Sequence, residues 1–360
     1  MSPDISFLIP VHNAAATLDG CLAALGRQEL DGTVEFVFVD DGSTDGSAER
    51  LAQARRADPT RVRVLTRPNG GEAAALNTGW PETRGRWVAI IEADVEPAPD
   101  WTRRCLAALA ESESAIAAGG HLVTPEDDPW IARLAGYEVE AKLLSRGAEV
   151  EHLTSANVLY RREAFDIAGP FDESLVNASL DAVFNQSLRA AGRTLLYVRE
   201  ARALHHYKTS LAGFLRRQIA YARYRAWSSS VELYPADRSL AVEVAAAALA
   251  VGLVGAGALT LALARPAPDP ASLDSAARAL ALGGVVSALV ALGMSTTRAW
   301  RFRALRPDPA LWLYPPVSLL RALVAAPAAG VGWLDHRLRS SRRPGPPRRS
   351  PAPPPADGAA

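Results

Sequence analysis

The sequence predicts an α/β fold in which a mostly parallel sheet is flanked by helices and followed by apolar, membrane-type helices. The first observation is three apolar, β-branched runs near the start: Ile5–Ile9, Val34–Val39 and Trp87–Ile91. Each run precedes a segment of helical period, namely Ala14–Arg27, Gly46–Arg56 and Asp100–Ser112. Buried parallel strands read as continuous apolar runs, and the crossover between them carries a helix. The second observation is a sharp change of composition near Leu240, after which long uncharged stretches appear.

Each of the three apolar runs ends in a short polar or acidic cluster. These clusters are Pro10-Val11-His12-Asn13, Asp40-Asp41-Gly42-Ser43 and Glu92-Ala93-Asp94. Ligands of an open parallel sheet bind at the carboxyl ends of its strands, so we expect the clusters to share one edge. Two of them carry carboxylates, which suits a divalent cation that bridges to substrate phosphates.

The order of these motifs resembles glycosyltransferase family 2, the inverting nucleotide-sugar transferases of GT-A fold. The cluster at Pro10 is similar to the family's first-strand element, and Asp40-Asp41-Gly42-Ser43-Thr44-Asp45 is its most recognisable signature. Further similar segments follow in the family's order: Asn69-Gly70-Gly71, Leu76-Asn77-Thr78-Gly79, Pro99-Asp100-Trp101, Asn157–Phe165 and Gly169–Glu173. The resemblance covers roughly residues 4 to 230, so residues 1–230 are expected to form a GT-A catalytic domain.

The resemblance implies a divalent metal, Mn²⁺ or Mg²⁺, held by the third cluster. Asp94 matches the second acid of the family's metal motif and is expected to be a direct ligand. Glu92 replaces the aspartate usual at the first position; it is expected to bind substrate, although its longer side chain leaves a ribose or a metal contact open. The alternative is that the acids only favour the N-terminus of the next helix.

The nucleotide end of the donor is expected to lie against the first two clusters. By resemblance, Asp41 contacts the nucleobase or ribose, and Pro10 and His12 form part of the same wall. Gly42 and Gly71 are expected to serve backbone conformation without chemistry of their own.

By resemblance, the catalytic base comes from the acceptor side of the site. Asp181 aligns with the family's catalytic aspartate and is expected to take the proton of the acceptor hydroxyl. Leu180 and Val183 stand where further acids are expected, so a helix-capping role for Asp181 stays open. Asn157, at the start of the acceptor-side segment, is expected to bind substrate.

Two histidines and an arginine complete the expected site. His205 and His206 follow an expected strand over Thr194–Val198, and His206 is predicted as a metal ligand, with a structural role as the alternative. Arg217 lies in the basic and aromatic segment Phe214–Trp227. That segment either closes over the diphosphate, which makes Arg217 substrate-binding, or lies on the lipid headgroups.

The distribution of charge and cysteine indicates the compartment. The formal net charge is zero, but the first 150 residues are acidic and the remainder is basic, as expected for a chain with an anionic membrane as partner. No nucleic-acid motif is found, so no nucleic-acid partner is expected. Two cysteines, Cys21 and Cys105, are expected to be reduced and buried. Because no signal peptide precedes Ile5, the catalytic domain is expected to remain cytoplasmic.

Two uncharged stretches in the predicted membrane region, residues 240–335, are long enough to span a bilayer. Val244–Ala264 and Ala279–Thr297 are the predicted spans, and arginines after the second span favour a hairpin that starts and ends in the cytoplasm of a multi-pass inner-membrane protein. A third stretch, Leu311–Leu334, contains prolines expected to break a helix, so a re-entrant or interfacial segment is favoured over a span. Residues 336–360, rich in Pro and Arg, are expected to be disordered.

The sequence thus predicts a membrane-anchored inverting glycosyltransferase. Its donor would be a nucleotide sugar, and its acceptor a lipid-linked or cell-envelope glycan. A catalytically degenerate protein that binds nucleotide sugars is the alternative, because Leu180, Val183 and Glu92 depart from the family pattern. A sugar nucleotidyltransferase is disfavoured, since no Gly-rich phosphate loop follows the first strand.

Overall fold

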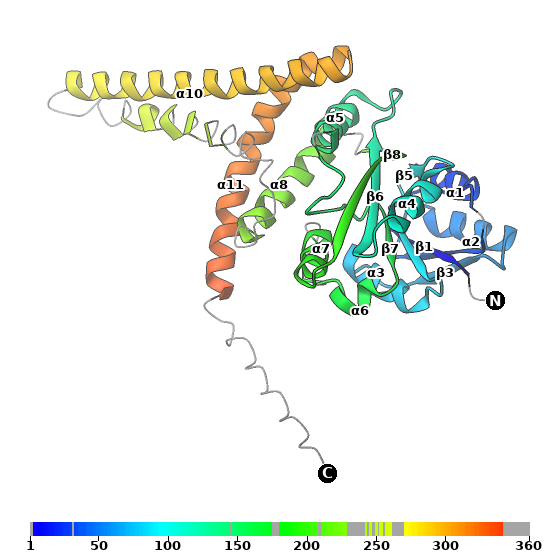
Figure 1. The fold of residues 1–360 in the computed structure, drawn as a ribbon. Coiled ribbons are helices and arrows are strands. Elements are labelled where there is room, and N and C mark those ends of the chain that lie inside the picture. The colour runs from blue at the N-terminus through cyan, green and yellow to red at the C-terminus, as the bar shows by residue number, and fades with distance from the viewer. Residues whose placement is uncertain are drawn as a thin grey trace, which may run out of the picture.

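The structure is a computed structural model of the 360-residue chain. It describes residues 3–30, 32–144, 146–174, 180–207 and 210–228, short pieces between 242 and 260, and residues 270–340. A sheet with helices on both faces forms the N-terminal part, and two long helices extend from it (Figure 1).

Eight strands form one mixed sheet, in the order β3-β2-β1-β4-β7-β6-β8-β5. The strands are β1 Ile5–Val11, β2 Val34–Asp40, β3 Val62–Thr66, β4 Trp87–Ile91, β5 Val95–Pro97, β6 Ala115–Val123, β7 Asn157–Arg161 and β8 Thr194–His205. The first four strands of this order are parallel, as predicted, whereas β7 is antiparallel to both β4 and β6. The predicted parallel arrangement is therefore confirmed for β3, β2, β1 and β4, the half of the sheet that carries the three polar clusters.

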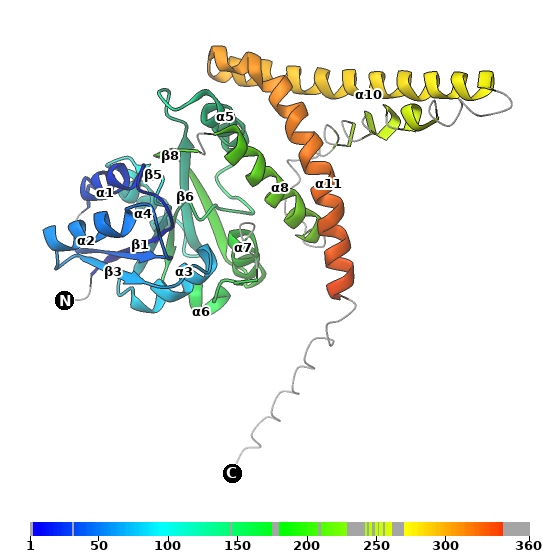
Figure 2. The ribbon, with the colours of Figure 1, turned by 180° about the vertical axis from the view of Figure 1, so that it is seen from behind.

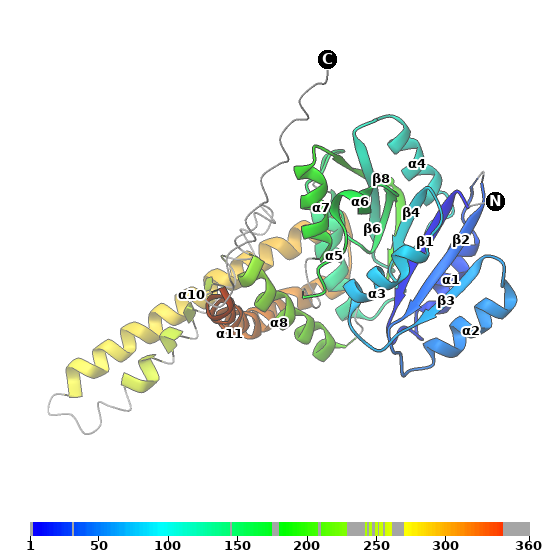
Figure 3. The same ribbon diagram turned by 90° about the horizontal axis from the view of Figure 1, so that it is seen from below.

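Helices pack against both faces of this sheet and create two separate hydrophobic cores (Figures 2 and 3). Those of the N-terminal part are α1 Leu18–Gly26, α2 Ser47–Ala57, α3 Glu72–Gly79, α4 Trp101–Ala110, α5 Trp130–Leu144, α6 Ala164–Ala168, α7 Leu180–Ala190 and α8 Leu211–Ser228, with a short 3₁₀ turn, η1, over Trp80–Glu82. Side chains of α1, α2 and α4 fill one core, and those of α3, α6 and α7 fill the other. The three predicted helices exist but begin or end one to four residues from the expected positions.

Cys21 and Cys105 lie in α1 and α4 and are both free and buried, as predicted. Burial in the apolar core raises the pKa of both thiols far above its ordinary value. Gly42 and Gly71 have φ of 72° and 89°, a region that strongly favours glycine, so the expectation of a backbone role is confirmed.

The C-terminal part consists of α10 Pro270–Leu305, the 3₁₀ turn η3 Pro309–Leu313 and α11 Tyr314–Ser340. Among the described residues, one stretch, Ser275–Leu305 in α10, is long and apolar enough to cross a membrane, and it contains the predicted span Ala279–Thr297. The predicted span Val244–Ala264 is described only in short pieces. Residues 336–340 of the predicted disordered tail belong to α11, and residues 341–360 lie outside the described residues.

The expected break of the third apolar stretch is wrong, because α11 is one continuous helix. Pro315 and Pro316 fall in its first turn, where a missing N–H costs no intrahelical hydrogen bond. Pro327 lies inside the helix without ending it.

Arg321, in the same stretch, is 3% exposed and donates to Glu138 of α5 at 2.6 Å. Burial alone would raise the pKa of Glu138, but Arg321 and its cationic neighbours lower it to about 2. The arginine thus attaches α11 to the N-terminal part. Figure 1 shows α11 running beside α8, while α10 points away from the sheet.

Candidate active site

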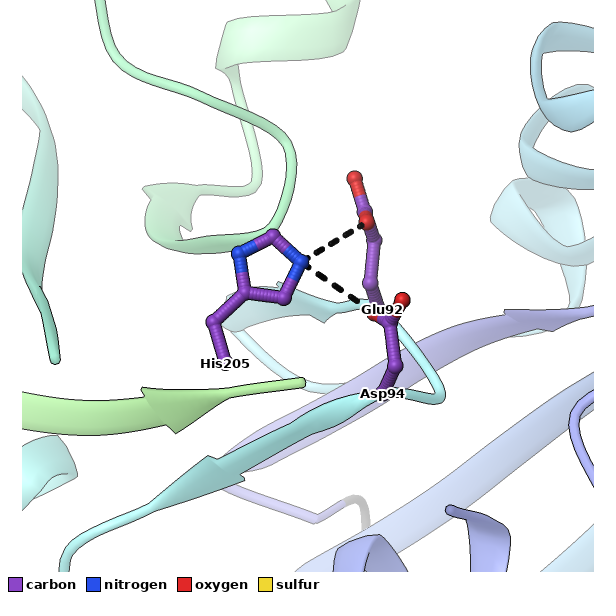
Figure 4. Close-up of side chains that lie close together, drawn as sticks. All are labelled: Glu92, Asp94 and His205. Carbon is purple, nitrogen blue, oxygen red and sulfur yellow. Dashed lines mark ion pairs between the residues drawn. The ribbon is translucent and has the colours of Figure 1, made fainter. Parts of the chain in front are cut away.

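A cluster of two carboxylates and one imidazole lies at the carboxyl end of β4. Glu92 and Asp94 follow β4 directly, and β5 then pairs antiparallel with the end of β8, which sets His205 opposite Val95. His205 Nε2 lies 3.5 Å from Asp94 Oδ1 and 3.9 Å from Glu92 Oε2 (Figure 4). The candidate ligand atoms of the three residues all lie within 4.8 Å of one another.

The donor set of this cluster suits a divalent cation. His205 is 5% exposed, and neither of its ring nitrogens has a hydrogen-bond partner in the part of the chain that the structure describes. Burial and then the neighbouring carboxylates Glu72 and Asp94 raise the pKa of Glu92 to about 8. One imidazole and two partly buried carboxylates whose ligand atoms converge are the chemistry that a divalent metal ion can neutralise.

His206, the predicted metal ligand, lies elsewhere. Its Nδ1 is 2.9 Å from Asp128, and its Nε2 is 3.1 Å from Glu96. Burial lowers the pKa of His206, but the two carboxylates raise it above its ordinary value. Because β8 continues to His205, the side chains of His205 and His206 point to opposite sides of the strand. His205, and not the predicted His206, therefore faces Glu92 and Asp94.

Asp181 lies in the first turn of α7, where several groups hold its carboxylate. The Ala182 N–H donates to Oδ1 at 2.8 Å, and His152 Nε2 lies 3.3 Å from Oδ2. Burial by itself would raise the pKa of Asp181, but His152 and the backbone N–H groups of Ala182 and Ser155 lower it. Asp181 is therefore ionised at neutral pH, as a general base must be.

Glu72, at the start of α3, is a site residue that sequence reasoning missed. Its Oε1 is buried and has no hydrogen-bond partner among the described residues. Burial first, and then the charges of Asp181 and Asp94, raise the pKa of Glu72 to about 7, while Ser155 and Arg217 act in the opposite direction. Glu72 thus lies within electrostatic reach of both Asp181 and the cluster of Glu92, Asp94 and His205.

The segment that precedes β7 connects these groups. The Ser155 hydroxyl donates to Glu92 Oε1 at 3.5 Å, and the Ala156 carbonyl accepts from the Glu92 N–H at 3.1 Å. The backbone N–H of the same Ser155 lies close enough to Asp181 to help lower the pKa of its carboxyl group. One short stretch of chain therefore fixes the carboxylate cluster relative to Asp181.

Asp41 organises the neighbouring loop at the end of β2. Its carboxylate accepts from the backbone N–H of Gly70 at 3.0 Å and of Gly71 at 2.7 Å, and it pairs with Arg67. The side chain is therefore engaged in holding the loop that leads into α3. A contact between its carboxylate and a nucleotide stays a prediction.

His12 lies beside Asp41, as expected. Its Nδ1 is 2.9 Å from the Asp41 carbonyl oxygen, and the Asn69 amide lies 3.0 Å from the same nitrogen. Pro10 is in β1 opposite Val39, two residues from His12 along the strand. The structure thus brings the predicted nucleotide-wall residues to one edge of the sheet.

Arg217 contacts a side chain of its own helix, α8. Its Nε donates to the Tyr221 hydroxyl at 2.8 Å, and Tyr221 contributes most to raising the pKa of Arg217. Burial opposes this effect, while Glu92 and Asp94 raise the pKa further. A permanent cation therefore lies within electrostatic reach of both carboxylates.

Asn157 is the first residue of β7 and pairs with Ile91, next to Glu92. It is 1% exposed, and both polar atoms of its amide lack hydrogen-bond partners among the described residues. A substrate contact by Asn157 stays a prediction.

Comparison with known proteins shows what this chain is similar to. The family model described as glycosyl transferase family 2 matches residues 6–167. This part of the chain belongs to glycosyltransferase family 2. The chain is 31% identical over 195 residues to the succinoglycan biosynthesis protein ExoO of Rhizobium meliloti, covering 52% of each chain. It is 26% identical over 171 residues to an undecaprenyl-phosphate 4-deoxy-4-formamido-L-arabinose transferase of Aeromonas hydrophila, covering 45% of this chain and 50% of the relative.

The fold extends beyond the family match. The chain is similar to a mannosyltransferase from Pyrobaculum calidifontis solved with GDP-Man and Mn²⁺, with a TM-score of 0.53 and 16% identity over 91% of this chain and 87% of the other. This confirms the predicted GT-A fold. The glycosyltransferase family 2 domain lies in a chain that spans little more than half the length of curated relatives such as ExoO.

Proposed function

We propose that this protein is an inverting, metal-dependent glycosyltransferase that moves one sugar from a nucleotide diphosphate sugar to a lipid-linked or cell-envelope acceptor. The observation that carries the proposal is the convergence of Glu92, Asp94 and His205 with Asp181 around one sheet edge. The first three suit a cation and its diphosphate, and the last suits removal of a proton. Both are needed when a hydroxyl displaces a nucleotide.

Each group has a part in the proposed reaction. Asp181 accepts the proton of the acceptor hydroxyl as that oxygen attacks the anomeric carbon and the bond to the diphosphate breaks. Arg217 pairs with the leaving diphosphate, whose charge grows in the transition state. His12 and Asp41 lie where the nucleoside end would be held. Attack from the side opposite the leaving group inverts the anomeric centre.

We assign the cation to Glu92, Asp94 and His205, with His205 in place of His206. The ring nitrogens of His205, which lack hydrogen-bond partners among the described residues, and the raised pKa of Glu92 support this set. When bound, Mn²⁺ or Mg²⁺ would act as a Lewis acid that neutralises the diphosphate. The Mn²⁺ and GDP-Man in the mannosyltransferase of similar fold are consistent with such a site.

A donor screen tests the proposed activity. Purified full-length protein is mixed with UDP-, GDP- and dTDP-sugars with and without Mn²⁺, and the rise in Tm is recorded. At least one donor should stabilise the protein only with the metal, since a ligand that binds the native state raises its stability. The same donor should then be hydrolysed slowly in the absence of acceptor. No stabilisation by any donor would contradict the proposal.

A catalytically degenerate nucleotide-sugar-binding protein is the second candidate. Leu180 and Val183, which flank Asp181 in α7, supply no second acid, and this favours a site that binds donor without turning it over. Donor binding without hydrolysis or transfer, under conditions where the metal binds, would favour this candidate.

The proposed location is the cytoplasmic face of the inner membrane, with an anchor formed by α10 and the preceding predicted span. Apolar side chains along α10 are exposed, including Leu282, Val285 and Leu289. The arginine-bearing end of α10 packs against α5 of the glycosyltransferase domain through Phe302. Basic residues mark the cytoplasmic side, so the domain and that end of α10 would lie on the same side of the bilayer.

We predict the topology from this arrangement. Residues 1–239 should be cytoplasmic, only the loop around Pro266–Asp274 should be outside, and the basic tail should return to the cytoplasm. A cysteine at Ser272 should react with a membrane-impermeant reagent in intact cells, whereas cysteines at Ser2 and Ser350 should not. Labelling at Ser350 would mean that α11 also spans the membrane, and labelling at Ser2 would exclude a cytoplasmic domain.

We predict that Arg217→Met weakens the binding of nucleoside diphosphates. A hydrogen bond to a charged group contributes roughly 1.5–3 kcal/mol, so the Kd for UDP or GDP with Mn²⁺ should rise about 10- to 100-fold in calorimetry. Arg216→Met is the matched control, because Arg216 is the exposed neighbour in the same helix and its loss should change the Kd little. Equal effects of the two substitutions would exclude a specific diphosphate contact.

A further inference from the structure

We propose that His152 is a positioning residue that holds the Asp181 carboxylate in the orientation needed for proton transfer; this rests on the proposed function of Asp181. His152 precedes β7 and is 8% exposed, and its Nε2 lies 3.3 Å from Asp181 Oδ2. Its backbone carbonyl accepts from Arg146 at 2.9 Å, which fixes the loop that carries the ring. A buried imidazole with one nitrogen on the base is thus built into the fold.

Asn185 determines which nitrogen of His152 carries the proton. Asn185 lies one helical turn after Asp181 in α7 and is fully buried. Its Oδ1 accepts from the Tyr160 hydroxyl at 3.3 Å, and its Nδ2 donates to the Leu153 carbonyl at 2.6 Å. These two contacts orient the amide so that its NH₂ group faces His152 Nδ1 at 3.3 Å.

An NH₂ group can only donate, so Nδ1 of His152 must accept. With Nδ1 accepting, the ring proton lies on Nε2, the nitrogen that is 3.3 Å from Asp181 Oδ2. An imidazolium would set an N–H against the NH₂ of Asn185, which disfavours that state. His152 consequently cannot take a proton from Asp181, and its function is to orient the carboxylate rather than to relay the proton.

The geometry leaves Asp181 little freedom to rotate. Oδ2 lies 3.3 Å from His152 Nε2, Oδ1 accepts from the Ala182 N–H, and the Ser155 N–H lies close enough to help lower the pKa of the carboxyl group. Burying Tyr160, Asn185 and His152 costs free energy unless each polar group is paired, and the chain of bonds from Tyr160 to Asp181 pairs them in series. The last group in this series of contacts is Asp181, the proposed base.

Two measurements test the inference. The first is ¹⁵N–¹H NMR of the wild-type full-length protein, labelled at histidine nitrogens, near neutral pH. His152 should appear as a neutral ring protonated on Nε2. A ring protonated on Nδ1, or on both nitrogens, would overturn the assignment irrespective of any activity.

The second measurement is donor hydrolysis by His152 variants, with a donor selected by the screen described above. His152→Leu removes the donor to Asp181 and should lower kcat about 10- to 100-fold, the scale of misplacing a catalytic group. The KM for the donor and the Kd for its nucleoside diphosphate should stay within about 2-fold, because His152 contacts neither. His152→Gln offers an N–H near the position of Nε2 and should restore most of the loss.

His121→Leu is the matched control, because His121 is also a buried histidine with one hydroxyl partner, Tyr197 at 2.7 Å. Its kcat should match that of the wild type. Unchanged kcat in folded His152→Leu, or no recovery in His152→Gln, would refute the positioning role. If Asp181→Asn itself retains activity, the proposed base fails instead, and the NMR result still decides the tautomer.

Discussion

Asp181→Asn is expected to lower kcat by roughly 10²-fold or more while leaving the binding of nucleoside diphosphate nearly unchanged. General-base catalysis contributes on this scale, and an amide cannot accept the proton. The amide keeps the size of the side chain, and Asn Oδ1 can still accept from the Ala182 N–H, so the start of α7 should persist. Initial rates of sugar transfer or donor hydrolysis, with calorimetry for the nucleotide, provide the measurement.

The opposite pattern would support the helix-capping alternative for Asp181. In that case the Asn variant would unfold at a clearly lower Tm and lose nucleotide binding together with activity. The pKa of Asp181 is lowered in the folded protein. The ionised carboxylate therefore stabilises the fold above the ordinary titration range of aspartate, and this stabilisation is lost as the pH falls through the lowered pKa. Thermal melts of both proteins at neutral and acidic pH separate stability from catalysis.

Asp94→Ala is expected to abolish turnover and the metal-dependent part of nucleotide binding without unfolding the protein. Asp94 contributes one of the two carboxylates in the Glu92, Asp94 and His205 cluster, and its loss removes both a ligand and a charge opposite the cation. The test compares the Kd of UDP or GDP with and without Mn²⁺. Wild-type affinity should depend on the metal, and the affinity of the variant should not.

Two further variants sharpen this assignment. His205→Ala should weaken the response to Mn²⁺, whereas His206→Ala should leave the metal dependence intact, because His206 bonds to Glu96 and Asp128 instead. Full turnover by Asp94→Ala in the presence of Mn²⁺ would remove the metal site from the proposal.

The sequence predicted the parallel half of the fold because β1, β2 and β4 are continuous apolar runs whose ends carry polar motifs. The same logic placed Asp41, Glu92 and Asp94 at one edge. It did not extend to His205, because β8 was expected to end at Val198. Pairing with β6 on one side and with the three residues of β5 on the other prolongs the strand, and such long-range pairing leaves little local signal.

In the structure, Ala201, Ala203 and His205 are buried, and Arg202 and Leu204 are exposed, which is the alternation of a strand with one covered face. The sequence does not show this alternation, because the exposed Leu204 is apolar. His152 and Glu72 also had no local signal. Their place in the site depends on how α7 and α3 pack beside the β4 edge, and no motif in their own segments indicates this.

Helix α5 and the C-terminal helices share one hydrophobic core, and this limits where the chain can be cut. Leu134 and Tyr137 of α5 pack with Phe302, Leu311 and Tyr314, and Asp308 pairs with Arg133. A protein cut after residue 230 would expose these apolar side chains to water and leave Glu138 without its arginine. We therefore expect that a stably folded fragment needs more than the family domain: it should also keep the end of α10, η3 and the start of α11.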